Sequence, residues 1–133
     1  MENKINIMRA LADETRLRII NLFIKSGQIL CVCELVDALK IPQYAVSKAL
    51  TIIKNADLLT AEKKGTWVYY GLNKTPQNKT LFTFFKSYLN EEILFEDEQR
   101  LNNRLLLREG NKCVVGIVPE SDLLKMIKQK AEV

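Results

Sequence analysis

One β-hairpin signal stands in a chain whose other segments have helical spacing, and this combination limits the fold most strongly. The polar turn Lys63-Lys64-Gly65 lies between residues 58–62 and the run Thr66-Trp67-Val68-Tyr69-Tyr70, which is rich in aromatic and β-branched side chains. Apolar residues recur at helical spacing to about residue 26, then over 28–39 and 42–55. Short helices followed by a hairpin with a basic tip predict a mainly α fold with a small β-hairpin, a winged helix-turn-helix.

Capping residues place the helix ends. We expect Asp13 to cap a second helix and Gly27 to end it. The helix over 28–39 is entered through residues 28–30, which have the composition of an extended segment, and Pro42 suits the first turn of the next helix. The buried positions expected in the first helix are Ile5, Met8 and Leu11, and those in the fourth are Val46, Leu50 and Ile53.

The second half of the chain predicts one long helix and a tail. Residues 73–78 are polar and contain Pro76, so we expect a loop there. A helical pattern then runs from Lys79 to about Arg108, with room for one break near Asn90, and Gly110 ends it. We therefore expect residues 1–110 to form a winged-helix DNA-binding and dimerisation domain with a long C-terminal dimerisation helix. Residues 111–133 form a tail with a short helix from about 120 to 130.

Composition excludes several classes of protein. The chain of 133 residues has no histidine, which removes Ser-His-Asp and Cys-His catalysis and every zinc site that needs imidazole. Its three cysteines are an odd number, a poor basis for a disulfide framework. No apolar run reaches the length of a membrane span, and the charged N-terminus lacks the features of a signal peptide. We therefore expect a cytoplasmic protein with no membrane partner.

Positive charge gathers where a winged helix would meet DNA. Residues 40–65 hold five lysines and two acidic residues, a net charge of +3 out of the chain's +4. The candidates for base-edge and phosphate contacts are Gln43, Tyr44, Ser47 and Lys48, and those for phosphate contacts at the hairpin tip are Lys63 and Lys64. Each candidate has an alternative role that does not involve DNA. The lysines could be an ordinary solvated surface, Tyr44 could pack against the fold, and Ser47 could hydrogen-bond its own helix backbone. Trp67 is expected in the core, and of Tyr69 and Tyr70, which face opposite sides, one packs inward.

The stretch from Met8 to Leu72 resembles the ArsR/SmtB family of metal-sensing repressors. Residues 11–19 (LADETRLRI) are similar to its opening helix pair, 42–50 (PQYAVSKAL) to its recognition helix and 64–70 (KGTWVYY) to its wing. Residues 30–35 (LCVCEL) resemble the thiol signature of the arsenic-sensing branch. The resemblance implies a homodimeric repressor that binds a palindromic double-stranded operator without any cofactor and leaves it when metal binds. The chain departs from the family at Lys48-Ala49, where Arg-His is frequent, and at Val36, where arsenic sensors carry a third cysteine.

The cysteines suggest the inducer. Cys31 and Cys33, without histidine, select a soft thiophilic ion, and Cys113 provides a third thiol. Trivalent arsenic or antimony accepts three thiolates, so we expect one of these ions, with cadmium or lead as alternatives. A thiol redox switch, inert core cysteines and, least favoured, a thiol redox enzyme are the other interpretations.

The spacing of the first two cysteines adds a mechanism. Residues i and i+2 of an α-helix point about 200° apart, so we expect the first turn of the third helix to unwind when both bind one ion. Unwinding would disturb the support of the DNA-contacting helix.

Overall fold

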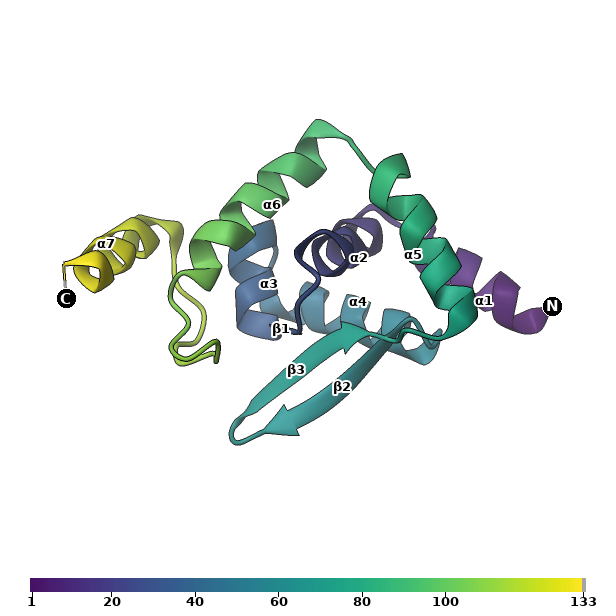
Figure 1. Ribbon diagram of the computed structural model, residues 1–133, viewed down its shortest axis with the longest axis horizontal. Helices are drawn as coiled ribbons and strands as arrows, with labels where there is room; N and C mark the ends of the chain where they lie inside the picture. Colours follow the sequence, from purple (N-terminus) through teal and green to yellow (C-terminus); the bar gives the residue numbers. More distant parts are fainter. Residues whose placement is uncertain (133) are drawn as a thin grey trace.

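The computed structural model describes residues 1–132. The helices are α1 (Glu2–Leu11), α2 (Glu14–Ser26), α3 (Val32–Leu39), α4 (Gln43–Asn55), α5 (Pro76–Tyr88), α6 (Glu92–Leu105) and α7 (Glu120–Ala131) (Figure 1). The strands are β1 (Leu30–Cys31), β2 (Leu59–Lys64) and β3 (Trp67–Leu72). None of the helices within residues 1–132 combines the length and apolarity needed to cross a membrane. The predicted winged helix-turn-helix, mainly helical with a small hairpin, is confirmed.

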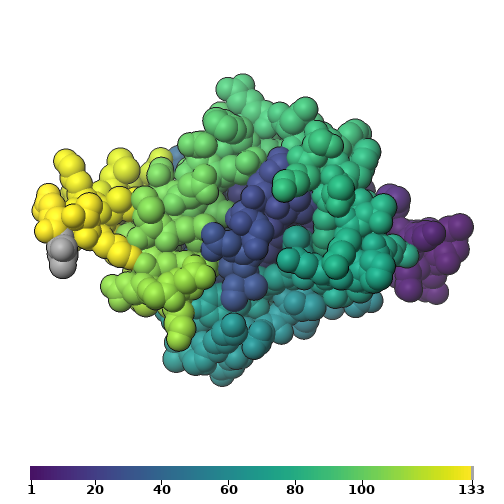
Figure 2. All heavy atoms as spheres, viewed as in Figure 1, coloured from purple at the N-terminus to yellow at the C-terminus, as the bar shows by residue number. Residues whose placement is uncertain are grey.

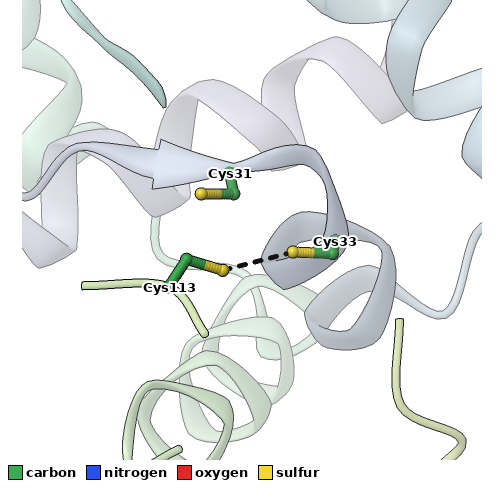
Figure 3. A group of neighbouring side chains, drawn as sticks. All are labelled: Cys31, Cys33 and Cys113. Atoms are coloured by element: carbon green, nitrogen blue, oxygen red, sulfur yellow. Dashed lines mark hydrogen bonds between the residues drawn. The ribbon is translucent and has the colours of Figure 1, made fainter. Parts of the chain in front are cut away.

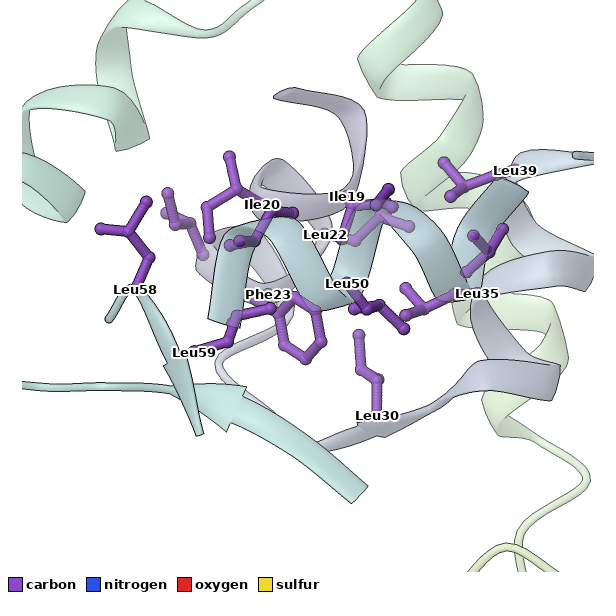
Figure 4. Close-up of a cluster of buried hydrophobic side chains, with 14 of the residues drawn as sticks. Ile19, Ile20, Leu22, Phe23, Leu30, Leu35, Leu39, Leu50, Leu58 and Leu59 are labelled. Atoms are coloured by element: carbon purple, nitrogen blue, oxygen red, sulfur yellow. The ribbon is translucent and has the colours of Figure 1, made fainter. Parts of the chain in front are cut away.

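The core is built around α2. Its consecutive residues Ile19 to Ile24 are all buried, because α3, α4, α5 and α6 contact the helix from several sides. Leu35 and Leu39 of α3 and Leu50 of α4 complete the centre of the cluster (Figure 4). The three expected buried positions of α4 are confirmed. A helix enclosed in this way fixes the positions of α3 and α4, which carry the candidate functional residues.

The predicted ends of α2 are correct. The Asp13 carboxylate accepts a hydrogen bond from the Arg16 backbone N–H at 3.1 Å, as an N-cap does. Gly27 ends the helix with φ at +64°, a region that favours glycine. Pro42 immediately precedes α4 rather than forming its first turn.

The hairpin is confirmed and gains a third strand, but its predicted turn is displaced. Lys63 and Lys64 pair with Val68 and Trp67 and so belong to β2 rather than to the turn. The sheet has the order β1-β3-β2 and is antiparallel, with Lys64 opposite Trp67 around a two-residue turn in which Gly65 has φ at +64°. β1 adds to the other edge of β3, so that Cys31 pairs with Tyr69. Tyr69 is buried and Tyr70 half-buried. Trp67, expected in the core, packs against the cysteines but is only partly buried.

Two boundaries after the hairpin differ from the prediction. Residues 76–78 belong to α5 rather than to a loop, because Thr75 caps the helix and Pro76 occupies its first turn, where no N–H is needed. Asn78 is buried there and donates hydrogen bonds to the carbonyls of Asp57 and Asn73, both at 2.8 Å. The single long helix is two helices, separated at residues 89–91 close to the break allowed near Asn90. The second of them ends at Leu105, before Gly110.

The buried face of α1 differs in part from the prediction. Ile7, Ala10 and Leu11 are buried, whereas Ile5 and Met8 are exposed. α1 packs against α2 and α4, and part of its apolar surface stays uncovered. α1 and α7 project at opposite ends of the molecule (Figure 2).

Candidate thiol site and DNA-binding surface

The structure brings all three cysteines together. The sulfur atoms of Cys31, Cys33 and Cys113 lie within 4.8 Å of one another, and all three residues are buried and unbridged. Figure 3 shows them on three segments: the end of β1, the first turn of α3 and the coil after α6. The Cys33 and Cys113 sulfurs are 3.4 Å apart and share a hydrogen bond.

The expected unwinding of α3 is not needed for this arrangement. Cys31 is the N-cap of α3, with extended backbone angles of −90° and 160°, and only Cys33 is helical. The 200° separation applies to two residues of one helix, so it does not describe this pair. The backbone change at Val32 lets both thiols approach the same point while the first turn of α3 stays intact.

Glu34 anchors the Cys31 end of the site. Its carboxylate accepts the Cys31 backbone N–H at 3.0 Å and hydrogen bonds from Nε and Nη2 of Arg108, each at 2.7 Å. Both members of this ion pair are buried, and Arg108 also donates to the Ile29 carbonyl at 2.7 Å. Arg108 thus ties the segment after α6 to β1 and to the start of α3.

Arg104 anchors the Cys113 end. Its guanidinium bonds the Asp37 carboxylate at 2.6 Å and the carbonyls of Val115 and Gly116 at 2.8 and 2.9 Å. Asp37 in turn accepts the Val118 backbone N–H at 2.9 Å. The tail that carries Cys113 is therefore bound to both α3 and α6.

The wing forms the third side of the site. The Tyr69 hydroxyl accepts the Cys113 backbone N–H at 2.9 Å, and Trp67 packs against the three cysteines and Tyr69. Since Cys31 is also the strand partner of Tyr69, β3 contacts the thiol site through both backbone and side chains.

The three thiols have different acidities. Hydrogen bonding from the Cys31 thiol, with smaller effects from Cys113 and the Arg104 charge, lowers the pKa of Cys33 to about 7 against the effect of burial. Burial is the main cause that raises the pKa of Cys113 to about 11. Hydrogen bonding to Cys33 and burial raise the pKa of Cys31. The cluster therefore favours one thiolate, at Cys33, near neutral pH.

This donor set fits a soft ion that takes three sulfur ligands. Structural zinc takes four nitrogen or sulfur ligands, and the cluster found among residues 1–132 provides three thiols in a chain without histidine.

Sequence reasoning found the thiols but missed the residues that hold them. Arg100, Arg104 and Arg108 recur every four residues, which places them on one face of a helix in an otherwise acidic segment. Arg100 donates to the Ala38 carbonyl at 2.6 Å, so all three arginines contact α3. Glu34, three residues after an N-cap, has the position of a capping-box acid. Both signals were present in the sequence.

The candidate DNA-contacting residues lie on α4 and the wing, which contact one another. Gln43, Tyr44 and Lys48 are exposed and Ser47 is half-buried. Tyr44 is 78% exposed, so it is not a packing residue. Lys63 and Lys64 are exposed at the end of β2. Lys40 forms an ion pair with Glu120, which reduces the free positive charge near α4.

Known proteins resemble this chain in sequence and fold. Residues 13–61 match the family described as bacterial regulatory protein, arsR family. The arsenic resistance transcriptional regulator ArsR1 of Pseudomonas putida is 42% identical over 96 residues, 71% of this chain and 74% of that protein. The arsenical resistance operon repressor of Bacillus subtilis is 41% identical over 73 residues, 55% of this chain and 69% of that protein.

Solved structures agree on the fold. The transcriptional regulator HlyU of Vibrio vulnificus matches with a TM-score of 0.56 and 30% identity, over 65% of this chain and 88% of that chain. Reduced HlyU of Vibrio cholerae has a TM-score of 0.59 at 23% identity, over 68% and 92% of the two chains, which shows a common fold. The family that matches residues 13–61 and the two relatives above are described as regulators or repressors, which assigns the chain to transcription regulation and not to the thiol redox enzymes. The chain belongs to the ArsR family of bacterial transcriptional regulators.

Proposed function

We propose that this ArsR-family repressor leaves its operator when trivalent arsenic or antimony binds Cys31, Cys33 and Cys113. One observation carries the proposal: three buried thiols from distant parts of the chain lie within 4.8 Å of one another. The names of the similar arsenical resistance repressors support it. Glu34, Arg104 and the wing hold the thiols in place from three separate directions.

The surroundings of the site favour loss of a proton from one of the three thiols. Thiols must lose their protons to bind a soft ion, so binding releases protons. Cys33, with its pKa lowered to about 7, loses its proton more readily than the other two thiols. The guanidinium group of Arg104 lies close enough to favour negative charge on Cys33. Arg104 and Arg108 are each paired with a carboxylate, so they orient the site more than they neutralise it.

The site is connected to both DNA-contacting elements. Cys31 pairs with Tyr69 in the wing, and Cys33 belongs to α3, which packs against α4. An ion that draws three sulfurs together therefore shifts β1, α3 and the tail relative to β3 and α4. Binding linkage is reciprocal, so operator DNA must weaken ion binding by the factor by which the ion weakens DNA binding.

We assign the DNA contacts to the exposed residues of α4 and the wing. Gln43, Tyr44, Ser47 and Lys48 contact bases and phosphates in the major groove, and Lys63 and Lys64 contact phosphates beside it. The repressor binds the two halves of a palindromic operator as a homodimer and needs no cofactor to do so.

The test is release of a labelled operator fragment, followed by fluorescence anisotropy during titration with arsenite, antimonite, cadmium, lead and zinc. We expect arsenite and antimonite to release DNA from the parent protein at the lowest concentrations. Cys31→Ser and Cys33→Ser keep DNA binding but abolish release, because serine has a similar size and is not a soft ligand. Val114→Ser, at an exposed neighbour of Cys113, is the matched control and behaves as the parent. Release of the two cysteine variants at parental arsenite concentrations contradicts the proposal.

A redox switch is the second candidate, favoured by the 3.4 Å separation of the Cys33 and Cys113 sulfurs. Hydrogen peroxide would take two electrons from this pair, forming a disulfide and two water molecules. Cys31→Ser distinguishes the two functions. A redox switch keeps peroxide-driven release in this variant, whereas an arsenic sensor no longer shows arsenite-driven release.

A further inference from the structure

A cavity of about 470 Å³ opens beside the thiol site, between the wing and the loop over residues 110–113. Cys113 forms part of its lining, together with Trp67 and Tyr69 of β3. Its volume lies within the range of about 300–1,000 Å³ that is usual for small-molecule sites. The three cysteines are at most 7% exposed, so this cavity provides a path from solvent to a thiol.

The charged residues that line the cavity are basic. Lys64, at the wing tip, and Lys112, in the loop, both line the cavity, and no acidic residue among residues 1–132 does so. The Lys64 ammonium lies 5.9 Å from the centre of the Tyr69 ring, above one wall. Glu62 is on the same strand but is not among the lining residues. The cavity thus joins aromatic walls, two cations and a thiol.

We propose that this cavity receives the ion as a complex with a small thiol that bears carboxylates. The inference rests on the proposed function, because it concerns how the ion reaches Cys113. A thiophilic ion among excess small thiols is bound by them, so the protein must take it from a thiolate complex. Carboxylates on the carried thiol pair with Lys64 and Lys112, and its apolar atoms contact Trp67 and Tyr69.

The transfer is a ligand exchange without oxidation or reduction. The Cys113 sulfur bonds to arsenic as one bond between arsenic and the small thiol's sulfur breaks. The cysteine proton passes to the departing thiolate, which leaves through the cavity as a free thiol. Two further exchanges transfer arsenic to Cys33 and Cys31. They are aided because both sulfurs already lie within 4.8 Å of the Cys113 sulfur.

We predict that the rate at which arsenic transfers to the protein depends on the charge of the small thiol that carries it. Arsenite is mixed beforehand with glutathione, which has two carboxylates, or with 2-mercaptoethanol, which has no charge. Stopped-flow absorbance then follows the formation of arsenic–cysteine bonds in the DNA-free protein. We expect the glutathione complex to react faster per complex with the parent at low salt. This advantage should disappear as salt rises, because the attraction is between exposed charges.

Lys112→Gln tests the lining directly. We expect it to reduce the advantage of the glutathione complex by about two- to fivefold, the effect of one exposed ion pair, and to leave the 2-mercaptoethanol rate unchanged. Lys125→Gln removes the same charge from an exposed position of α7 outside the cavity and is the matched control, with parental rates.

The outcomes separate this inference from the proposed function. Equal rates for the two complexes in the parent, or a ratio unchanged in Lys112→Gln, overturn the inference while arsenic binding stands. If neither complex forms arsenic–cysteine bonds, the proposed function fails and the inference fails with it.

Discussion

Glu34 accepts hydrogen bonds from the Cys31 backbone and from the Arg108 guanidinium, although its side chain is fully buried. A buried carboxylate is tolerated only when it is paired and hydrogen-bonded, and both conditions hold here. The same group therefore caps α3, fixes the backbone of one candidate ligand and binds the segment that leads to Cys113. Single residues of this kind set the geometry of the thiol site without being candidate ligands themselves.

The first prediction concerns this carboxylate. Glu34→Gln leaves the Arg108 charge buried without its counter-ion, so we expect the free energy of unfolding to fall by about 3–5 kcal/mol. Urea denaturation followed by circular dichroism measures it. Glu96→Gln, at an exposed position of α6, is the control and should change stability little. A decrease no larger than that of the control would show that the pair does not stabilise the fold.

At the scale of single residues, the sequence shows which side chains could bind an ion. It does not show the backbone conformation that positions them. Cys31, Cys33 and Cys113 can be identified as candidate ligands because soft-ligand chemistry depends on residue type. The conformation of Cys31 is harder to predict, because cysteine is not among the residue types that usually cap a helix. The pairing of Cys31 with Tyr69, which keeps it extended, joins two residues that are far apart in the sequence.

Arg100 and Arg104 of α6, together with Arg108 just after its end, form one contact surface. Arg100, Arg104 and Arg108 contact Ala38, Asp37 and Glu34, so α6 and the segment after it follow α3 along its length. The wing contacts the other side of the thiol site through Tyr69 and Trp67. These two elements, with α3, enclose the thiols, and the wing also carries the candidate phosphate contacts.

The second prediction concerns the wing. Lys63→Gln and Lys64→Gln remove charges that we assign to phosphates, so affinity for specific and nonspecific DNA should fall alike. The slope of log affinity against log salt should become shallower by about 0.9 for each phosphate that is no longer neutralised. Anisotropy titrations with operator and scrambled duplexes at several salt concentrations measure both effects. An altered sequence preference would refute this assignment.

The third prediction concerns α4. If Gln43 contacts a base edge, Gln43→Ala should cost about 1–3 kcal/mol of specific binding and leave nonspecific binding unchanged. Competition titrations with operators altered at single base pairs locate the contact. Thr51→Ala, at an exposed position of the same helix, is the control. Equal reductions on operator and scrambled DNA would assign Gln43 to the backbone instead.

Local signals predict most elements, and neighbouring contacts explain the exceptions. Asp13, Gly27 and the turn at Gly65 mark their boundaries because capping and turn chemistry act within a few residues. The polar surroundings of Pro76 predict a loop, whereas its neighbours Thr75 and the buried Asn78 make it the start of a helix. The hydrogen bonds that Asn78 donates to backbone carbonyls depend on where the wing ends, which periodicity does not contain.

On the surface of the whole molecule, apolar side chains of α1, α5 and α6 are exposed to solvent. Met8 of α1, Phe84 and Tyr88 of α5, and Phe95 of α6 are between 53% and 64% exposed. Phe84 stacks on Tyr88 with ring centres 4.7 Å apart. Exposed apolar groups of this size on a single chain are typical of an interface, which agrees with the expected dimer.

The fourth prediction is therefore a dimer at micromolar concentration in sedimentation equilibrium. Phe84→Glu places a charge on the exposed surface of α5, so we expect it to weaken association and leave the fold intact. Lys86→Gln, also at an exposed position of α5, lowers the net charge by the same single unit and is the matched control. A parent protein that sediments as a monomer would contradict this account, and with it the expected half-site spacing of about 34 Å or a multiple.

The meeting of Cys113 with Cys31 and Cys33 is the feature that sequence reasoning does not resolve. The closest of these contacts joins residues 80 positions apart. This contact depends on the break between α5 and α6, on Arg104 and Arg108, and on the turn after α6. The residues next to Cys113 in the sequence do not indicate any of these features. Residue type makes Cys113 a candidate ligand, and the tertiary structure supplies its position.

The sulfur coordination number of bound arsenic tests the central claim most directly. X-ray absorption at the arsenic edge, on arsenite-loaded protein without added thiol, counts the sulfur neighbours. We predict three sulfurs in the parent and two in Cys113→Ser, with arsenite releasing DNA from the variant only at higher concentrations. The same number of sulfurs in both proteins, with the same release from DNA, would contradict a site built from Cys31, Cys33 and Cys113.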